Sequence, residues 1–87
     1  MIKTTVTLNI PGGLHLRPAE QLCGRAMHYR SDVELALRDG RYNAKSVLSV
    51  LGACVKRGDE IEFVCEGEDE EEALSCMVHL VDSGLGE

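Results

Sequence analysis

The apolar residues of this chain change their spacing along its length, and that change restricts its possible folds more than any other feature. Between residues 2 and 10, apolar or threonine side chains occupy every second position, which is the period of a strand with one buried face. From residue 16 to about residue 28, apolar residues recur at the three- and four-residue intervals of a helix with one buried stripe. The apolar face of the strand and the apolar stripe of the helix must both be buried, and packing them against each other achieves this. The helical stripe contains Leu16, Ala19, Leu22, Cys23, Ala26 and Met27.

The rest of the chain divides into five further elements by the same criterion. Alternating apolar residues predict a strand that a turn at residues 38–40 joins to a shorter strand, so that the two form a hairpin. Gly52 ends a brief apolar run after Ser46, and Gly67 ends a later strand. We predict strands at residues 33–37, 41–44 and 61–65, and helices at residues 47–52 and 69–83.

The resulting order, β-α-β-β-α-β-α, belongs to the α+β class. When all helices pack on one face of a single sheet, the apolar sides of the strands and of the helices are buried against each other. We therefore predict one such sheet, in a single domain over residues 1–87. The pattern alone does not separate this arrangement from a ferredoxin-like domain with an added helix.

Length and charge limit the partners of the chain. Its 87 residues have a formal net charge of -6 at pH 7. Nucleic acids and anionic membranes bind basic faces, so this charge argues against both, and we expect protein partners. A chain of this length buries roughly 60 to 65% of its unfolded surface, which makes a deep substrate cavity improbable. No apolar segment approaches the about 18 residues of a membrane span, and residues 1–10 do not resemble a signal peptide. We therefore expect no membrane insertion and a cytoplasmic location.

Neither the cysteines nor the acidic residues have the spacing of a metal site. No CxxC or HxxxH pair supplies neighbouring ligands, and without an export signal we expect reduced thiols that act as small buried hydrophobes. The acidic run at residues 66–72 lacks the alternating ligands and fixed glycine of a calcium loop, so we interpret it as a solvated helix start. We expect no metal and no cofactor. The four cysteines are Cys23, Cys54, Cys65 and Cys76.

The segment GLHLRPA, from Gly13 to Ala19, places an imidazole directly before a predicted helix start. Pro18 has no amide hydrogen and a fixed φ, so it suits the first turn of a helix, and this puts His15 at the cap. The open amides of a helix start favour an anion, and the forked donors of Arg17 match phosphate oxygens. The segment therefore predicts a phosphate site at which His15 is a candidate phosphoryl acceptor.

Two further landmarks accompany this segment. They are the sequence AKS at residues 44–46 with the apolar run at residues 47–51, and the ending SGLGE at residues 83–87. Together the three landmarks resemble the HPr family, the histidine-containing phosphocarriers of the bacterial phosphoenolpyruvate:sugar phosphotransferase system, and the ending is similar to that of the Gram-positive branch. The resemblance covers essentially the whole chain. It implies an open-faced β-sandwich, in which three helices cover one face of a four-stranded antiparallel sheet. It also implies a phosphoryl carrier in sugar transport rather than a turnover enzyme.

The resemblance assigns roles to individual residues. It implies that Enzyme I phosphorylates His15 on Nδ1, that Arg17 stabilises the transferred group, and that Enzyme IIA domains then receive it. Ser46 matches the regulatory serine of the family, which an HPr kinase/phosphorylase modifies in the Gram-positive branch to give a ligand of a catabolite-control transcription regulator. Serine is also a preferred N-cap, so we expect Ser46 to begin its helix. We expect a monomer that docks through Leu16 and through an exposed apolar patch formed by Val47, Leu48 and Leu51.

Five positions depart from common patterns of the family. Leu16 replaces a small or polar residue, and Glu20 adds a negative charge one turn beyond the histidine, so both weaken the local field for a phosphate. Gly24 and Met27 stand where many relatives offer basic residues to Enzyme I, and Cys54 stands where glycine is common. Candidate sources of compensating positive charge are Arg25, Arg30 and Lys45.

Two other functions stay open at this point. A regulatory paralogue would keep the fold and act mainly through Ser46, although the intact pair of His15 and Arg17 argues against it. A ferredoxin-like binding module, such as a metal carrier, is disfavoured because CxxC spacing is absent. We interpret His28 and His79 as solvated or partly packed helix residues, since neither follows a glycine turn.

Overall fold

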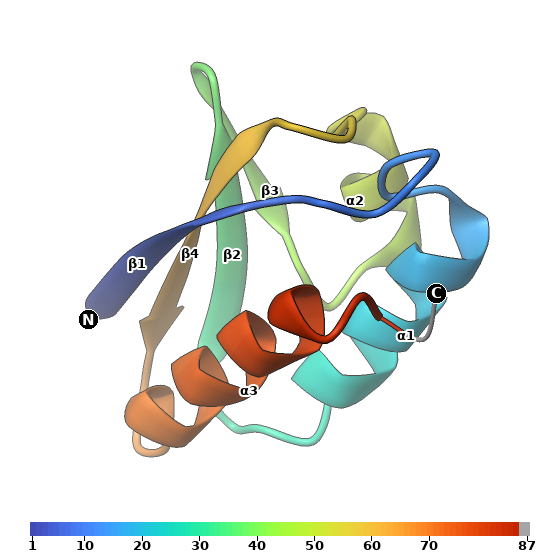
Figure 1. Ribbon diagram of the computed structural model, residues 1–87. Helices are drawn as coiled ribbons and strands as arrows, with labels where there is room; N and C mark the ends of the chain where they lie inside the picture. Colours follow the sequence, from blue (N-terminus) through green and yellow to red (C-terminus); the bar gives the residue numbers. More distant parts are fainter. Residues whose placement is uncertain (86–87) are drawn as a thin grey trace.

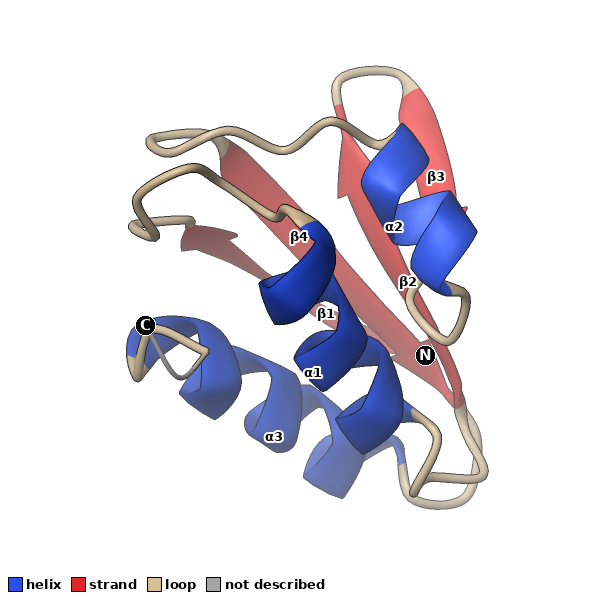
Figure 2. Ribbon diagram, turned by 90° about the vertical axis from the view of Figure 1, so that its right-hand side faces the viewer, coloured by secondary structure: helices blue, strands red, loops and turns tan. Residues whose placement is uncertain are grey.

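The computed structural model describes residues 1–85, which form four strands and three helices in the predicted order (Figure 1). The strands make one antiparallel sheet with the order β1-β4-β2-β3. All three helices lie against the same face of this sheet (Figure 2), so the predicted open-faced β-sandwich is confirmed. The strands are β1 (Ile2–Thr7), β2 (Asp32–Leu37), β3 (Gly40–Asn43) and β4 (Glu60–Glu66). The helices are α1 (Leu16–Ala26), α2 (Val47–Gly52) and α3 (Glu70–Asp82).

The core lies between the sheet and the helices. The central strands β2 and β4 pair so that Leu35 lies opposite Phe63 and Val33 lies opposite Cys65. These four side chains are buried, and Leu22 of α1 is buried with them. The strand alternation and the helical spacing of the sequence are therefore satisfied against each other, as predicted.

β1 is shorter than predicted, although the alternation that defines it continues. The strand ends at Thr7, whereas Leu8 and Ile10 stay fully buried. The amide of Leu8 donates to the carbonyl oxygen of Asp59 at 2.9 Å, and the amide of Gly58 donates to that of Leu8 at 2.7 Å. Gly58 has a φ of +94°, so the chain before β4 turns out of the regular ladder here. Burial thus extends past the end of the paired strand.

α1 ends at Ala26 rather than near His28. The amide of His28 donates to the carbonyl oxygen of Arg25 at 3.1 Å, the three-residue spacing of a tightened last turn. Leu16 and Met27, at the two ends of the predicted stripe, are 56% and 66% exposed, so the prediction that they are buried is wrong. The buried side of α1 consists of Pro18, Ala19, Leu22, Cys23 and Ala26.

The remaining elements differ little from their predicted bounds. β3 begins at Gly40 instead of Arg41, because Gly40 already pairs with Leu37 across the hairpin. α3 begins and ends one residue inside its predicted range, with Asp69 and Ser83 as its caps. Within residues 1–85, no helix combines the length and the apolar character that crossing a membrane requires.

Candidate functional site

Two glycines shape the turn before α1. Gly12 and Gly13 have φ values of +84° and +72°, in the left-handed region that residues with a Cβ rarely adopt. The amide of Gly13 donates to the carbonyl oxygen of Ile10 at 2.9 Å, and the amide of His15 donates to that of Gly13 at 3.0 Å. These bonds reverse the chain after β1 and bring His15 to the start of the helix. We call residues 10–15 the histidine turn.

The histidine turn lies directly against the segment that follows α2. The amide of Leu14 donates to the carbonyl oxygen of Val55 at 3.0 Å. A Cβ at Gly13 would lie 2.3 Å from that oxygen and 3.0 Å from the Cα of Lys56, so only glycine fits without movement. Sequence reasoning missed this contact, because nothing local to either segment indicates the other.

His15 is the N-cap residue of α1, as predicted. Its backbone is extended, with φ -80° and ψ -173°, and its carbonyl oxygen accepts the amide of Ala19 at 3.0 Å. The side chain does not cap the helix but is exposed beside the turn, where a Cβ at Gly12 would lie 3.2 Å from the imidazole Cδ2. The first amides of a helix have no partner within it, so the imidazole stands where an anion is favoured.

Arg17 lies in the first turn of α1 with its side chain exposed. Within residues 1–85 it takes part in no ion pair, so its donors are available to an external anion. Pro18 follows it and is buried, in keeping with proline at a helix start. The structure thus brings His15, Arg17 and the helix start together at one exposed end of the molecule.

The three residues suggested as sources of compensating charge lie elsewhere. Arg25 is in the last turn of α1. The guanidinium of Arg30 pairs with Glu68 at 3.2 Å, and Nζ of Lys45 donates to the carbonyl oxygen of Tyr29 at 2.8 Å. All three positions belong to the far end of α1 or to the segments beside that end. None of them therefore adds positive charge next to His15.

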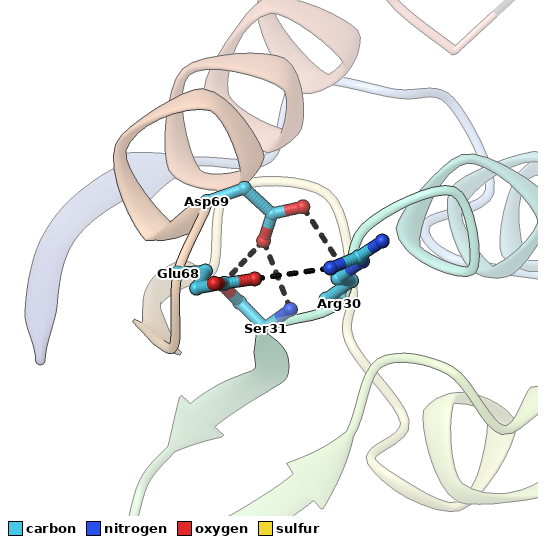
Figure 3. A network of polar contacts seen from close by, with 4 residues as sticks. All are labelled: Arg30, Ser31, Glu68 and Asp69. Carbon is cyan, nitrogen blue, oxygen red and sulfur yellow. Dashed lines mark hydrogen bonds and ion pairs between the residues drawn. The ribbon is translucent and has the colours of Figure 1, made fainter.

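The acidic run begins α3 at the opposite end of the molecule from the histidine turn (Figures 1 and 2). Figure 3 shows the carboxylate of Asp69 accepting the amides of Arg30 at 3.0 Å and Ser31 at 2.9 Å, together with the Ser31 hydroxyl at 2.5 Å. The hydrogen bond from the Ser31 hydroxyl, with those from the two amides, lowers the pKa of Asp69 to about 2. The interpretation as a helix start is confirmed for residues 69–72, whereas Glu66 is the last residue of β4. Asp69 also ties the β4–α3 loop to the α1–β2 loop.

Ser46 is the N-cap residue of α2, as predicted. Its Oγ accepts the amide of Ser49 at 3.2 Å, and the Oγ of Ser49 accepts the amide of Asn43 at 2.9 Å. Ser46 is half-buried, whereas Leu48, two residues further on, is 83% exposed. A hydroxyl and a large apolar side chain therefore lie within one turn of each other at the start of α2.

The four predicted docking residues differ in exposure. Leu16 and Leu48 are exposed, but Val47 and Leu51 are half-buried and pack against the core, because a six-residue helix must turn its apolar side toward the sheet. The prediction that Val47 and Leu51 are exposed is therefore wrong, while their role in docking stays a prediction. Met27 lies three turns after Leu16, on the same side of α1, and is also exposed.

The cysteines fall into two groups. Cys23 and Cys65 are buried as predicted, and burial raises the pKa of both thiols, that of Cys65 to about 11. Cys76 is half-buried, and Cys54 is exposed, which contradicts the prediction for it. Cys54 has a φ of 53° directly after the C-cap of α2, a position at which glycine is usual. Among residues 1–85, no group of three or more histidine, cysteine or acidic side chains is arranged to hold a metal ion.

Two other predictions concern the remaining histidines and the tail. His79 lies on α3 and is exposed, as interpreted from the sequence, whereas His28 is exposed in the turn after α1, so the interpretation that it is a helix residue is wrong. Ser83 caps α3 and Leu85 is buried, whereas Gly86 and Glu87, the end of the third landmark, lie outside the described residues.

Known proteins match this chain in fold and in sequence over most of its length. A family model described as the PTS HPr component phosphorylation site matches residues 2–83. The phosphocarrier protein HPr of Lysinibacillus sphaericus is 37% identical over 71 residues, which are 82% of this chain and 81% of that protein. The HPr-like protein Crh of Bacillus subtilis is 35% identical over 81 residues, which are 93% of this chain and 95% of that protein. A crystal structure of HPr from Thermoanaerobacter tengcongensis has a TM-score of 0.96 at 32% identity and covers 100% of this chain and 98% of that one.

These matches define a small phosphocarrier with an open-faced β-sandwich. The chain belongs to the HPr family of the phosphotransferase system. HPr is a phosphocarrier protein and not a turnover enzyme. The match to HPr structures also excludes the ferredoxin-like arrangement that the sequence pattern left open.

Proposed function

We propose that this chain accepts a phosphoryl group from Enzyme I on His15 and passes it to sugar-specific Enzyme IIA domains, as a cytoplasmic monomer. The observation that carries the proposal is the exposed imidazole at the N-cap of α1, with the exposed guanidinium of Arg17 in the first turn. A donor and an acceptor protein must reach the same ring nitrogen in turn, and a shallow site permits this. Membership of the HPr family supports the carrier role.

The transfer step needs little beyond position and charge. A lone pair on Nδ1 of His15 forms the bond to phosphorus while the bond between phosphorus and the donor atom breaks, and the donor keeps that electron pair. Arg17 and the first amides of α1 stabilise the charge on the phosphoryl oxygens. Delivery repeats the step with the acceptor protein as nucleophile and His15 as the leaving group.

Labelling with Enzyme I and phosphoenolpyruvate tests the acceptor. The variant His15→Ala should lose the label, whereas the controls His28→Ala and His79→Ala should keep it. A bond between nitrogen and phosphorus should make the label acid-labile and alkali-stable. Undiminished labelling of His15→Ala would show that another residue is the acceptor.

The variant Arg17→Lys tests the oxygen contacts. Lysine keeps the charge but loses the paired N–H donors that match a phosphate, so transfer should be slower while the fold stays intact. Stopped-flow transfer rates, with circular dichroism as the check on folding, measure this effect. Rates equal to those of the wild type would show that the forked donors of Arg17 are dispensable.

Docking is proposed to use the exposed Leu16 and Leu48, together with the half-buried Val47 and Leu51. Leu48 is 83% exposed, so replacing it with serine should leave the stability nearly unchanged. The same change should weaken Enzyme I binding, because an apolar side chain that becomes buried at an interface contributes to affinity. Titration calorimetry with Enzyme I measures the affinity, and an unchanged Kd would remove Leu48 from the docking surface.

A second function, regulation through Ser46, is favoured by the 35% identity to the HPr-like protein Crh. We propose that an HPr kinase/phosphorylase modifies Ser46 and that the product binds a catabolite-control transcription regulator. A phosphate at the start of α2 would add nearly two negative charges within a turn of Leu48. The helix start tolerates this charge, so the fold should persist while docking on Enzyme I weakens.

The regulation is tested by measuring Enzyme I affinity and the rate of His15 phosphorylation. The proteins compared are the wild type, Ser46→Ala, Ser46→Asp and the form phosphorylated on Ser46. Aspartate has one charge and two oxygens, so Ser46→Asp should reproduce the effect only in part. If the phosphorylated form docks and transfers as well as the wild type, the two sites do not interfere. Modification of Ser46 without any labelling of His15 would instead identify a regulatory paralogue.

A further inference from the structure

Most basic side chains in the described part of the chain are already engaged with other residues. Arg30, Arg38 and Arg41 form ion pairs with carboxylates. Arg25, Lys45 and Arg57 donate hydrogen bonds to uncharged groups. Within residues 1–85, the basic side chains without an ion pair or side-chain hydrogen bond are Lys3, Arg17 and Lys56.

The backbone of Lys56 is held beside the histidine turn from two sides. The preceding carbonyl oxygen, on Val55, accepts the amide of Leu14 at 3.0 Å. The amide of Lys56 itself donates to Oδ2 of Asp59 at 2.9 Å. A Cβ at Gly13 would lie only 3.0 Å from the Cα of Lys56, so the two backbones are in direct contact. An exposed lysine side chain therefore starts next to the turn that presents His15.

The charges around Lys56 leave its ammonium group available. Arg57 is directed to Asn9, since its Nε donates to Oδ1 of Asn9 at 3.1 Å. The carboxylate of Asp59 already accepts the Lys56 amide and lies 3.4 Å from the guanidinium of Arg38. The Asp59 carboxylate is thus occupied by other donors, and Lys56 has no ion pair with it.

We propose that Lys56 is a second cationic ligand of the phosphoryl group on His15, acting beside Arg17. This inference rests on the proposed function of His15. The imidazole lies beside Gly12, adjacent to the glycine that touches Lys56, and the flexible four-carbon stem of lysine lets its ammonium reach oxygens at that site. Such an ammonium binds phosphoryl oxygens through charge-assisted hydrogen bonds.

A small phosphoryl donor separates this role from contacts with a partner protein. Phosphoramidate transfers its phosphoryl group without Enzyme I: the bond from His15 nitrogen to phosphorus forms, the P–N bond of the donor breaks, and ammonia leaves. The test variant is Lys56→Gln, and Lys56→Arg keeps the charge. The matched control is Lys3→Gln, which removes the same charge from an exposed lysine on β1.

Lys56→Gln should slow phosphorylation by phosphoramidate by roughly threefold to tenfold. This reduction in rate is smaller than the one that follows removal of a donor from an enclosed oxyanion site, because water weakens the interaction between charges at an exposed site. Lys56→Arg should stay near the wild-type rate, and Lys3→Gln should not change it. High salt should reduce the difference between wild type and Lys56→Gln, since the interaction is between exposed charges. Circular dichroism should show the same fold in all four proteins.

A second measurement detects the charge of the Lys56 side chain and is insensitive to a purely structural role of this residue. The pKa of the phosphoryl group on His15, followed by phosphorus NMR, should be higher in Lys56→Gln than in the wild type, because the dianion loses a neighbouring cation. Lys56→Arg should restore the wild-type value.

Three other results have separate meanings. If Lys56→Gln slows only the reaction with Enzyme I, Lys56 contacts the donor protein and the inference is wrong. If neither donor nor the phosphoryl pKa is affected, Lys56 has no role at the site, and the inference is also wrong. If Enzyme I does not label the wild type although phosphoramidate does, the proposed function fails, while the effect of Lys56 on the phosphoryl group is still decided by the phosphoramidate comparison.

Discussion

Replacing Gly13 with alanine tests whether the close contact in the histidine turn holds the site together. The φ of +72° costs a residue with a Cβ about 1 to 2 kcal/mol. The new Cβ would also lie 2.3 Å from the carbonyl oxygen of Val55, about 1 Å inside ordinary contact. That oxygen must move away, which strains its hydrogen bond with Leu14, a bond with a net contribution of about 0.5 to 1.5 kcal/mol. We expect Gly13→Ala to lose about 1.5 to 3.5 kcal/mol of unfolding free energy.

Gly58→Ala is the matched control for this prediction. Gly58 also has a positive φ, +94°, but a Cβ there would meet nothing within 4 Å. It should therefore lose only the conformational part, about 1 to 2 kcal/mol. Urea unfolding followed by circular dichroism measures both values, and phosphorylation of His15 by phosphoramidate reports on the site. Phosphorylation should slow in Gly13→Ala and not in Gly58→Ala. If the two variants are equally stable and equally reactive, the contact with Val55 does not hold the turn.

Three further predictions concern charge, backbone conformation and capping. Because the pKa of Asp69 falls from 3.8 to about 2 on folding, the unfolded chain takes up its proton first, so stability should drop between about pH 4 and pH 2. In urea titrations, Asp69→Asn should flatten this part of the profile, and a slope as steep as in the wild type would contradict the assignment. Cys54→Gly should raise the unfolding free energy by about 1 kcal/mol by relieving the φ of 53°, whereas an unchanged urea midpoint would show that this backbone is unstrained. Ser46→Ala should cost about 0.5 to 2 kcal/mol by loss of the cap, with Ser46→Asp closer to the wild type; equal losses in both would argue against capping.

The local elements of this fold were predictable because each has its own signal. The alternation through Val33, Leu35 and Leu37 predicts a strand wherever it packs, and Ser46 before a short apolar run predicts a capped helix. His15 could be placed at a helix cap because Pro18 suits a first turn. These signals depend on neighbours in the sequence, and the structure confirms them.

What could not be predicted depends on contacts between distant segments. The bonds of Leu8 with Gly58 and Asp59 end β1 early, although its apolar alternation continues. Leu16 and Met27 fit the helical spacing, yet α1 buries a narrower side than the spacing suggests. The contact of Gly13 with residues 55–56, which brings Lys56 to the site, has no sequence signal at all.

The separation of charge between the two ends of the molecule has a consequence for how it moves toward other proteins. Exposed Arg17 and Lys56 lie at the end with the histidine turn, and the acidic run at residues 66–72 lies at the other. A body with this distribution experiences a torque in the field of a charged surface and not only a net force. Although the net charge is -6, we expect a negatively charged surface to favour orientations in which His15 faces it, because the six acidic side chains of residues 66–72 outnumber Arg25, Arg30 and Lys45 at the same end. A larger fraction of collisions then has the orientation that binding requires, which raises the association rate. This effect disappears at high salt, because salt shortens the range of the electric field.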